Sequence, residues 1–472
     1  MPVPIISVAQ MREWEQASWD AGRSVDAVMR LAGRAIADEA RRLTRAEEPI
    51  LILAGKGNNG SDSRYAAEYL DDRKVALIDA SQPAGLLEEL PNALADIRSH
   101  NGLVIDGLFG IGLNRPLEGD WRTLIEELNA ADERILAVDV PSGLNADTGE
   151  ILGDAVRACS TVTFGAPKTG MTLPKSTNLV GRLSVAATIG LIDCPFANSP
   201  NWTLANDFEN YPPARPIQGY KSTFGHLAII AGSQGFHGAA VLSARSAHRA
   251  MPGLVSVYTT PTAYPLVGSQ LQQSMVHPCS AQTELPASTT AILMGPGLAG
   301  SDIDDDWKEW AAQLWKKSPL PMVVDASALD WLPQNVQPRG LRIITPHPGE
   351  ASRMLEIPSS DIQGDREKTA DAIRRHYGDC HVVLKGHQTV IADNEGTTFN
   401  STGCPELGQG GSGDVLAGYL GGLIAQPMLC EKPGRTVRYA VWEHARVAEQ
   451  LSERQAAWDL NDLVPRLGNS RR

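Results

Sequence analysis

The amino-acid sequence predicts an α/β protein built from two different domains. Short apolar runs, each ending in a loop that carries glycine or proline, alternate with helix-like segments along most of the 472 residues. A stretch rich in proline and asparagine, residues 193–220, interrupts this alternation and separates two series of strands. No fixed-period repeat relates the two series, so we expect two unlike domains rather than a solenoid.

The first series begins with helices and continues as strands. Ser7 can cap a helix that runs to Trp19, and apolar residues recur at helical spacing between Val25 and Leu43. A helix-like stretch at 64–70 then separates the first two strands. This rhythm of strand, helix and strand builds parallel sheets, which bind ligands where their strands end. The expected strands are 49–54, 75–78, 103–105, 135–138 and 161–164.

The second series has the same character. Its apolar runs again end at polar or glycine-bearing loops, and a helix is expected to run from a glycine-rich loop at 408–413 through Leu423. The expected strands are 227–230, 255–258, 291–294, 322–324, 343–344 and 382–384.

The composition is that of an ordinary globular protein and disfavours two classes of partner. The chain has 42 Lys and Arg residues against 55 Asp and Glu, a formal charge of −13, and 42% hydrophobic residues. Its basic residues form no run longer than a pair, whereas nucleic acids and anionic membranes require a clustered positive field. We therefore expect no nucleic-acid partner and no membrane partner.

The cysteines and the N-terminal segment indicate a reducing compartment. The 6 cysteines are widely spaced, with no C-x-x-C pair and no histidine cluster, which disfavours both a zinc site and a disulfide framework. Charged residues near the start exclude the apolar core of a signal peptide, and no apolar run has membrane-spanning length. The expected location is the cytoplasm.

The first strand runs into a glycine-rich turn that matches the dinucleotide fingerprint G-x-G-x-x-G. The turn is Gly55-Lys56-Gly57-Asn58-Asn59-Gly60, and Asp79 ends the next strand, about where a ribose-binding acid would lie. Glycines let the backbone approach a pyrophosphate, and the following helix N-terminus supplies N–H groups. Such turns also occur without a ligand, and the two asparagines add side-chain carbonyls.

Oxygen-bearing side chains follow neighbouring strands of the first series. Asn59, Asp106 and Ser142 could converge on a monovalent or alkaline-earth cation beside an anionic ligand. The alternative is that Asp139 and Ser142 only form an Asx or Ser turn before Gly143.

Four motifs of the first half, in this order, resemble the NAD(P)H-hydrate epimerases over roughly residues 7–206. They are Gly57-Asn58-Asn59-Gly60-x-Asp62, Asp106-x-Leu108-Phe109-Gly110-x-Gly112-Leu113, Asp139-x-Pro141-Ser142-Gly143 and Phe164-x-x-Pro167-Lys168-x-Gly170. The resemblance implies a Rossmann-like three-layer domain over 1–206, with K⁺ held by Asn59, Asp106 and Ser142. It implies that Asp139 is the acid or base, with Lys168 near it. The implied contacts to the hydrated nucleotide are Asn58, Asn59, Gly60, Ser61, Asp62, Gly110, Ile111, Gly112, Leu113, Asn114, Arg115, Pro116 and Asp139.

Two residues depart from that family's pattern. Ser61 and Ser63 stand where the family usually has glycine. A serine lacks the positive-φ freedom and the backbone clearance of glycine. We therefore expect the epimerase half to be weakened or inactive.

The most specific chemical signature lies in the second half, at residues 408–418. Its glycines expose N–H groups that can cradle a phosphate, and the helix that follows adds its dipole. Asp414 lies in the first turn of that helix. It could simply complement the dipole, or it could act as a base that deprotonates a substrate hydroxyl beside a phosphoryl group.

With other motifs in order, this loop resembles the ADP- or ATP-dependent NAD(P)H-hydrate dehydratases of the ribokinase-like superfamily. The companion motifs are Tyr220-Lys221-x-x-Phe224-Gly225, Gly232-Ser233, Gly295-Pro296-Gly297-Leu298, Thr345-Pro346-His347-Pro348-Gly349-Glu350 and Leu384-Lys385-Gly386-His387-Gln388-Thr389. The resemblance implies a ribokinase-like three-layer α/β domain over 211–472, and Glu350 could organise Mg²⁺ water around the phosphates. It implies that the hydrate contacts Gly297, His347 and Asp414. The implied nucleotide contacts are Lys385, Gly386, His387, Gln388, Thr389, Gly411, Ser412 and Gly413.

Together the two halves predict a bifunctional enzyme that repairs hydrated NADH and NADPH, with ADP or ATP, Mg²⁺ and K⁺ as cofactors. The first domain would epimerise the R and S hydrates, and the second would dehydrate the S-hydrate, releasing AMP and phosphate when ADP is the donor. We also expect a homo-oligomer. Two alternatives stay open: a ribokinase-like small-molecule kinase with a non-catalytic nucleotide-binding domain, and a Rossmann NAD-dependent oxidoreductase.

Overall fold

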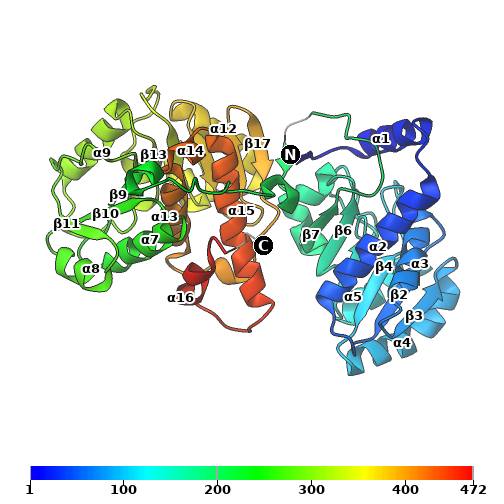
Figure 1. Ribbon diagram of the computed structural model, residues 1–472. Coiled ribbons are helices and arrows are strands. Elements are labelled where there is room, and N and C mark those ends of the chain that lie inside the picture. Colours follow the sequence, from blue (N-terminus) through cyan, green and yellow to red (C-terminus); the bar gives the residue numbers. More distant parts are fainter. Residues whose placement is uncertain (1, 198–199, 470–472) are drawn as a thin grey trace. The chain divides into compact units, whose positions relative to one another are not determined.

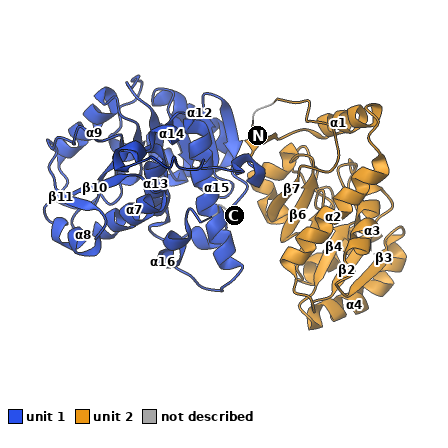
Figure 2. Ribbon diagram, viewed as in Figure 1, with its two compact units in different colours: residues 1–2, 203–472 blue, residues 3–202 orange. Residues whose placement is uncertain are grey.

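A computed structural model of the chain describes residues 2–197 and 200–469. The chain divides into two compact units, Val3–Trp202 and Thr203–Arg472 with Met1–Pro2 (Figure 2). We call them the N-terminal and C-terminal units and describe each by itself. No helix among the described residues has the length and apolar character needed to cross a membrane.

The N-terminal unit contains a parallel sheet with strand order β3-β2-β4-β5-β6-β7 (Figure 1). Five of these strands are those expected from the apolar runs, and β7 was not predicted. A short antiparallel pair, β1 (Val3–Pro4) with β8 (Asn201–Trp202), joins the two ends of the unit. The sheet strands are β2 (Ile50–Ala54), β3 (Val75–Asp79), β4 (Leu103–Gly107), β5 (Ile135–Val138), β6 (Ser160–Phe164) and β7 (Arg182–Ala186).

Helices cover both faces of this sheet. They form with it the three-layer arrangement that we expected. Alternate residues of β2 point to opposite faces: Ile50 and Ile52 belong to the core under α2 and α3, whereas Leu51 and Leu53 belong to the core under α4 and α5. Ser7 caps α1 by accepting a hydrogen bond from Gln10 N, as predicted. The helices are α1 (Val8–Asp20), α2 (Val25–Leu43), α3 (Asn58–Tyr69), α4 (Pro83–Ser99), α5 (Asp120–Ala130) and α6 (Thr177–Val180).

The C-terminal unit contains strands in the order β17-β16-β15-β14-β13-β12-β9-β10-β11. Strands β9 to β15 pair with one another in parallel. Strands β16 and β17 pair antiparallel at one edge of the sheet. The six expected strands are present, and β11, β16 and β17 were not predicted. The strands are β9 (His226–Ile230), β10 (Leu254–Thr259), β11 (Met275–Pro278), β12 (Ala291–Met294), β13 (Met322–Val324), β14 (Arg342–Ile344), β15 (His381–Leu384), β16 (Val390–Asp393) and β17 (Gly396–Phe399).

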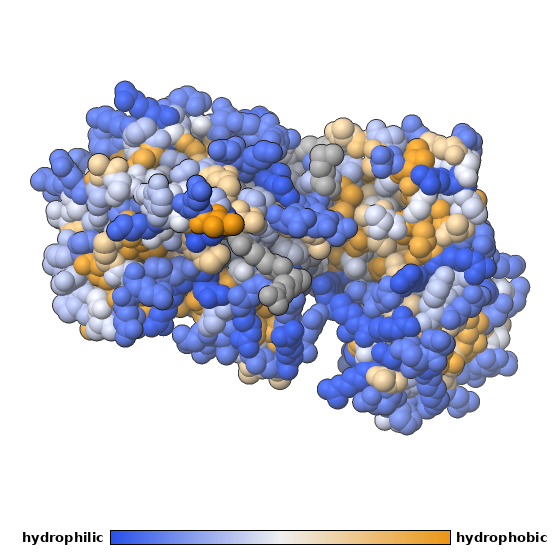
Figure 3. All heavy atoms as spheres, viewed as in Figure 1, coloured by the Kyte–Doolittle hydropathy of each residue, from blue (hydrophilic) through white to orange (hydrophobic). Residues whose placement is uncertain are grey.

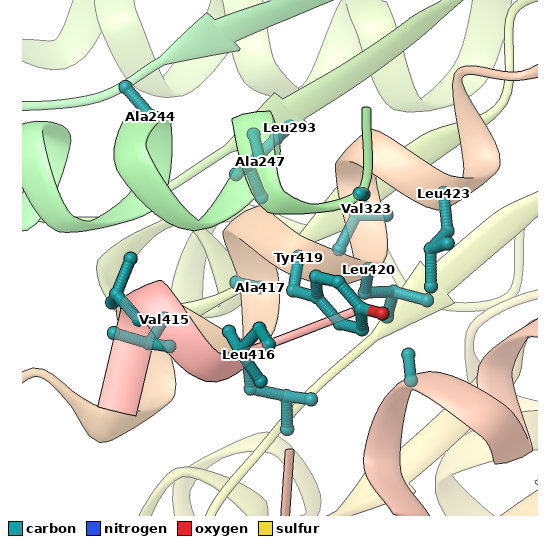
Figure 4. Close-up of a cluster of buried hydrophobic side chains, with 14 of the residues drawn as sticks. Ala244, Ala247, Leu293, Val323, Val415, Leu416, Ala417, Tyr419, Leu420 and Leu423 are labelled. Atoms are coloured by element: carbon teal, nitrogen blue, oxygen red, sulfur yellow. The ribbon is translucent and has the colours of Figure 1, made fainter. Parts of the chain in front are cut away.

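Helix α13 lies in the core of this unit and carries the glycine-rich loop at its start. Its apolar side chains contact α7 and strands of the sheet (Figure 4). A Cβ on Gly418 would lie 2.1 Å from Ser243 O, so glycine is what allows α7 and α13 to approach this closely. The helices are α7 (His237–Arg249), α8 (Tyr264–Gln270), α9 (Asp305–Lys317), α10 (Pro348–Leu355), α11 (Ser359–Gly364), α12 (Arg366–His376), α13 (Ser412–Ile424), α14 (Pro427–Cys430), α15 (Pro433–Ser452) and α16 (Leu460–Leu463).

Several large hydrophobic residues among the described ones are exposed at the surface. Figure 3 shows a mainly hydrophilic face for the C-terminal unit with isolated hydrophobic spots. Ile217 and Tyr220, in the segment that precedes β9, are the most exposed of these side chains at 103% and 70%. Single exposed apolar residues of this kind are normal for a globular protein.

Candidate active sites

A buried ion pair lies where β5 and β6 end in the N-terminal unit. Lys168 Nζ lies 2.7 Å from Asp139 Oδ1 and also donates to Thr163 Oγ1 at 2.8 Å and Phe164 O at 3.1 Å. Thr163 Oγ1 donates to the same carboxylate oxygen, Asp139 Oδ1, at 3.0 Å. Within the described residues, these bonds engage Oδ1 and leave Oδ2 available to a substrate.

The backbone conformation at Asp139 is unusual for a residue other than glycine. Asp139 has φ 62°, a left-handed conformation that aspartate tolerates better than most residues. A local turn with Ser142 was the alternative expected for this segment. The Asp139 and Ser142 side chains do not form an Asx or Ser turn, because Asp139 bonds to Thr163 and Lys168 while Ser142 bonds to Asp106. The turn that is present here is made by the backbone, from Pro141 O to Leu144 N.

Two further acidic side chains, Asp62 and Glu15, lie close enough to Asp139 for its charge to raise their pKa values. Burial, together with the charges of Asp139 and Glu15, raises the pKa of Asp62 to about 8. Burial and the charge of Asp139 also raise the pKa of Glu15, against the opposing charge of Lys168. At neutral pH Asp62 therefore carries a proton close to the Asp139 side chain, which is an arrangement suited to proton transfer.

Sequence reasoning missed Glu15. It lies on α1 in register with the buried residues Met11, Trp14 and Ser18, and this helical stripe is the signal that could have found it. A carboxylate on an otherwise buried helix face requires a reason, and the site at Asp139 supplies one.

The three oxygen-bearing residues predicted to hold a cation lie around one segment, residues 106–110. Ser142 Oγ donates to Asp106 Oδ1 at 2.6 Å, and Ser142 N donates to Asp106 Oδ2 at 2.9 Å. The Asn59 amide lies against Gly110, whose Cβ, if present, would lie 3.3 Å from Asn59 Oδ1. Among the described residues, Asn59 Nδ2 is buried without a hydrogen-bond partner, and the buried Asp106 has no cationic partner.

The predicted substrate segment at 58–62 is the first turn of α3 rather than part of a loop. Gly57 is the extended N-cap residue, and Ser61 N bonds to Gly57 O. Ser61 and Ser63 are helical and do not have positive φ, so the backbone freedom we expected them to need is not required. The protein's own backbone leaves room for Ser63, because Ser63 Oγ fits beside Gly107 and bonds to Asn59 O at 2.8 Å.

The other predicted substrate segment, 110–116, connects β4 to α5. It follows the carboxyl end of β4 and contains a turn in which Leu113 N bonds to Gly110 O at 3.2 Å. Gly112, Asn114, Arg115 and Pro116 are exposed, whereas Gly110, Ile111 and Leu113 are partly buried.

The glycine fingerprint serves internal packing in this unit. A Cβ on Gly55 would lie 2.2 Å from Leu108 O, and a Cβ on Gly60 would lie 1.9 Å from Gly55 O. Asp79, the expected ribose-binding acid, instead pairs with Arg64 at 3.2 Å. These contacts explain the motif without a dinucleotide and disfavour the oxidoreductase alternative.

In the C-terminal unit, Asp414 lies in the first turn of α13, where it was predicted. Gly411 is the N-cap residue with φ 96°, and Ser412 and Gly413 begin the helix. Burial and the neighbouring charge of Asp325 raise the pKa of Asp414 to about 7, although Lys385 opposes them. A carboxylate with this pKa is poised to act as a base near neutral pH.

A partly buried lysine lies among carboxylates at this end of the sheet. Lys385 Nζ lies 2.7 Å from Asp325 Oδ1 and 3.7 Å from Glu350 Oε2. Thr345 Oγ1 donates to Asp325 Oδ1 at 2.7 Å and fixes that carboxylate. Burial opposes the charge of Lys385, but the carboxylates outweigh it and raise its pKa. A Cβ on Gly413 would lie 3.3 Å from Lys385 Nζ, so the glycine loop borders the lysine.

His347 caps α10. Its Nδ1 accepts from Gly349 N at 3.0 Å and Glu350 N at 3.3 Å, and Glu350 Oε2 accepts from His347 N at 2.7 Å. The imidazole is about half exposed, with 52% of the side chain accessible, so it can also contact a ligand. Gly297 follows β12 with φ 65°, and a Cβ there would lie 2.4 Å from Phe236 O.

His444 was not predicted as part of this site. It lies buried on α15, and burial together with the charge of Lys385 lowers its pKa to about 4. His444 Nε2 has no hydrogen-bond partner among the described residues. The imidazole is neutral and stands close enough to Lys385 to be affected by its charge, which the sequence alone does not reveal.

Comparisons with known proteins match both halves of the chain. The family model described as NAD(P)H-hydrate dehydratase matches residues 227–467, and the model described as YjeF-related protein N-terminus matches 25–89 and 76–170. A curated relative from Coxiella burnetii, the bifunctional NAD(P)H-hydrate repair enzyme Nnr, is 32% identical over 486 residues. That match covers 97% of this chain and 97% of the relative.

Two solved structures each cover 55% of the chain. A hypothetical protein from Streptococcus mutans is 25% identical with TM-score 0.50, covering 55% of this chain and 94% of that one. An ADP/ATP-dependent NAD(P)H-hydrate dehydratase from Bacillus subtilis, co-crystallised with ATP and Mg²⁺, is 30% identical with TM-score 0.49. It covers 55% of this chain and 94% of its own.

Proposed function

The chain belongs to the family of bifunctional NAD(P)H-hydrate repair enzymes, and from that premise we propose which residues carry each reaction. The N-terminal unit converts the R and S hydrates into one another. The C-terminal unit dehydrates the S-hydrate to NAD(P)H with ADP as the phosphoryl donor. The observation that carries the second assignment is the convergence of Asp414, Lys385 and Asp325 beside the glycine-rich loop.

Asp414 is the base of the dehydration. It takes the proton from the hydroxyl on the hydrated ring carbon while the hydroxyl oxygen bonds to the β-phosphorus of ADP. The bond from that phosphorus to the AMP oxygen breaks, and AMP leaves. The carbon–oxygen bond to phosphate then breaks as the neighbouring ring carbon loses a proton. The products are NAD(P)H, phosphate and AMP.

Lys385 supplies positive charge where the phosphoryl group is transferred. Asp325 fixes its ammonium at 2.7 Å, so the charge is in place before the substrate arrives. The residues proposed to bind the hydrate with Asp414 are Gly297 and His347. The residues proposed to bind ADP are Lys385, Gly386, His387, Gln388, Thr389, Gly411, Ser412 and Gly413.

Asp139 is the acid or base of the epimerisation. Lys168 and Thr163 hold its Oδ1, which directs Oδ2 toward the hydrated carbon of the nicotinamide ring. Asp62, which is protonated at neutral pH, is placed to hold a proton for the same reaction. Substrate contacts are proposed along 58–62 and 110–116.

The oxygen atoms of Asn59, Asp106 and Ser142 fit a potassium ion. They are hard donors, and the Asp106 carboxylate is buried without a cationic partner among the described residues. When bound, K⁺ would supply positive charge for the anionic parts of the nucleotide. In the C-terminal unit, Mg²⁺ would bind together with the phosphates of ADP, near the carboxylate of Glu350.

We also propose that the protein acts in the cytoplasm, where NADH and NADPH are used, and that it forms a homo-oligomer. Its partners are then the hydrated nucleotides and ADP, with no nucleic acid. Light scattering of the purified chain tests the oligomer, since a monomer at working concentration would exclude it.

One experiment tests both activities. The purified chain receives Mg²⁺, K⁺, ADP and a mixture of both hydrate epimers, and the reduced-nicotinamide absorbance is followed against a control without ADP. Complete recovery that depends on ADP supports both assignments. Recovery of the S portion alone removes the epimerase assignment. No recovery with either ADP or ATP overturns the dehydratase assignment.

A further inference from the structure

The side chain of Arg366 binds the backbone of the loop proposed to hold ADP. Arg366 is the first residue of α12, and its guanidinium donates hydrogen bonds to carbonyl oxygens of the loop that follows β15. Because these bonds reach most of the loop, the arginine fixes the path of its backbone. The acceptors are Leu384 O at 2.9 Å, Lys385 O at 3.2 Å, Gln388 O at 3.5 Å and His387 O.

Those bonds also set the direction of the loop's N–H groups. In a planar trans peptide the C=O and N–H point in opposite directions, so a carbonyl that faces Arg366 turns the next N–H away from it. In the part of the chain described, the N–H groups of Gly386 and Gln388 have no hydrogen-bond partner. Both residues have positive φ, 139° and 49°, and outward N–H groups in such a turn form an anion-binding concavity.

The charge of Arg366 points to the same kind of ligand. Burial lowers its pKa to about 10, so it stays protonated at neutral pH. No carboxylate of the described residues forms an ion pair with it, so only carbonyl dipoles balance its charge. An anion on the far side of the loop would complete that balance.

We propose that Arg366 is a positioning residue for the nucleotide: it orients the N–H groups of Gly386 and Gln388 toward the diphosphate of ADP. The proposal rests on the proposed function, in which this loop binds ADP. Arg366 itself lies behind the backbone and does not contact the reacting atoms.

The test compares ADP binding and turnover in the full-length chain. Arg366→Met removes the fork and the charge, and Arg366→Lys keeps only the charge. Arg375→Met is the matched control, because Arg375 lies on the same helix, pairs with Asp371 and has 69% of its side chain exposed. Calorimetric titration gives the Kd of ADP without hydrate, and steady-state kinetics give KM for ADP, KM for the hydrate, and kcat.

Arg366→Met should raise the Kd and KM for ADP about tenfold or more, with kcat and the KM for the hydrate changed by less than about threefold. Arg366→Lys should lie between the wild type and Arg366→Met, and Arg375→Met should match the wild type. Hydrogen–deuterium exchange should show faster exchange of the loop amides in Arg366→Met before ADP is added. A loss of kcat alone, or equal losses for ADP and hydrate, would overturn the proposal.

Gly386→Val separates this proposal from the assignment of the loop. If the wild type binds ADP and Gly386→Val binds it equally well, ADP does not use the loop and the proposed function is wrong there. If Gly386→Val weakens binding and Arg366→Met does not, Arg366 has no positioning role. If circular dichroism shows that Arg366→Met does not fold, Arg366→Lys decides the question. An ADP affinity and a loop exchange rate equal to those of the wild type then count against a positioning role for Arg366, and a weakened ADP affinity supports it.

Discussion

Lys168 Nζ lies 2.7 Å from Asp139 Oδ1, and both side chains are almost completely buried. Removing one partner of a buried ion pair leaves the other charge uncompensated, which costs about 3 to 5 kcal/mol. We predict that Lys168→Met lowers the unfolding free energy of the N-terminal unit by that order. Because Asp139 is also released, the epimerisation rate should fall by about 10² or more.

The exposed Lys175 gives the matched control, Lys175→Met, which should change neither quantity. Epimerisation is measured by the exchange of R and S hydrates on a chiral column, without ADP. A Lys168→Met protein that keeps the wild-type rate would remove both Lys168 and the fixed Asp139 carboxylate from the proposed reaction.

Asp414→Asn tests the dehydration base. Turnover should fall by about 10² to 10⁴ while the Kd for ADP stays nearly unchanged, because the amide keeps the shape but cannot accept a proton. Asp305→Asn is the control, since Asp305 also lies in the first turn of a helix but has 90% of its side chain exposed. Near-normal turnover in Asp414→Asn would leave Asp414 only as a partner of the helix dipole.

The pH dependence of dehydration follows from the same carboxylate. Burial and Asp325 raise the pKa of Asp414 to about 7, and the base acts only when ionised. The value of kcat/KM for the S-hydrate should therefore rise with pH up to about 7 and then level off. A profile that is already flat from pH 5 upward would contradict a base with this pKa.

The sequence predicts features that leave a local pattern better than features that depend on contacts between residues distant in the chain. Apolar runs between glycine-bearing loops predicted the parallel strands, because burial on both faces leaves a local pattern. The start of α3 was missed, since Asn58, Asn59 and Gly60 are poor helix formers that tertiary contacts hold in a helix. Glu15 and Arg366 were missed because their partners lie far away in the sequence.

Asp62 predicts a pH effect on stability. Burial first, then the charges of Asp139 and Glu15, raise its pKa to about 8 in the folded state, from the ordinary aspartate value of 3.8. Between these values the folded state binds the extra proton, so stability is highest below about pH 4 for this group and is lost as the pH rises toward 8. Asp62→Asn should flatten that loss.

The measurement is urea unfolding at pH 6 and pH 9, with the N-terminal unit followed by hydrogen–deuterium exchange of β4. The exposed Asp71 gives the control, Asp71→Asn, which should keep the wild-type difference between the two pH values. Equal pH dependence in the wild type and in Asp62→Asn would show that Asp62 is not the group that titrates.

Potassium should matter to epimerisation. Replacing K⁺ by tetramethylammonium at constant ionic strength removes an ion that Asn59, Asp106 and Ser142 can hold, and the rate should fall about tenfold or more. Asp106→Asn should be slow in both salts because a carboxylate ligand is missing. An equal wild-type rate in the two salts would exclude a functional cation at these residues.

The two serines of α3 should not limit epimerisation. Ser63 Oγ occupies space that Gly107 leaves open, since a Cβ on Gly107 would lie 1.9 Å from it. Ser63→Gly and Ser61→Gly should therefore leave the rate unchanged within about threefold, while each lowers helix stability by about 0.5 kcal/mol. Gly107→Ala should destabilise the wild type more than it destabilises Ser63→Gly, because the second protein lacks the hydroxyl in the way. A rate that rises tenfold in the double variant Ser61→Gly/Ser63→Gly would restore the view that the serines weaken this half.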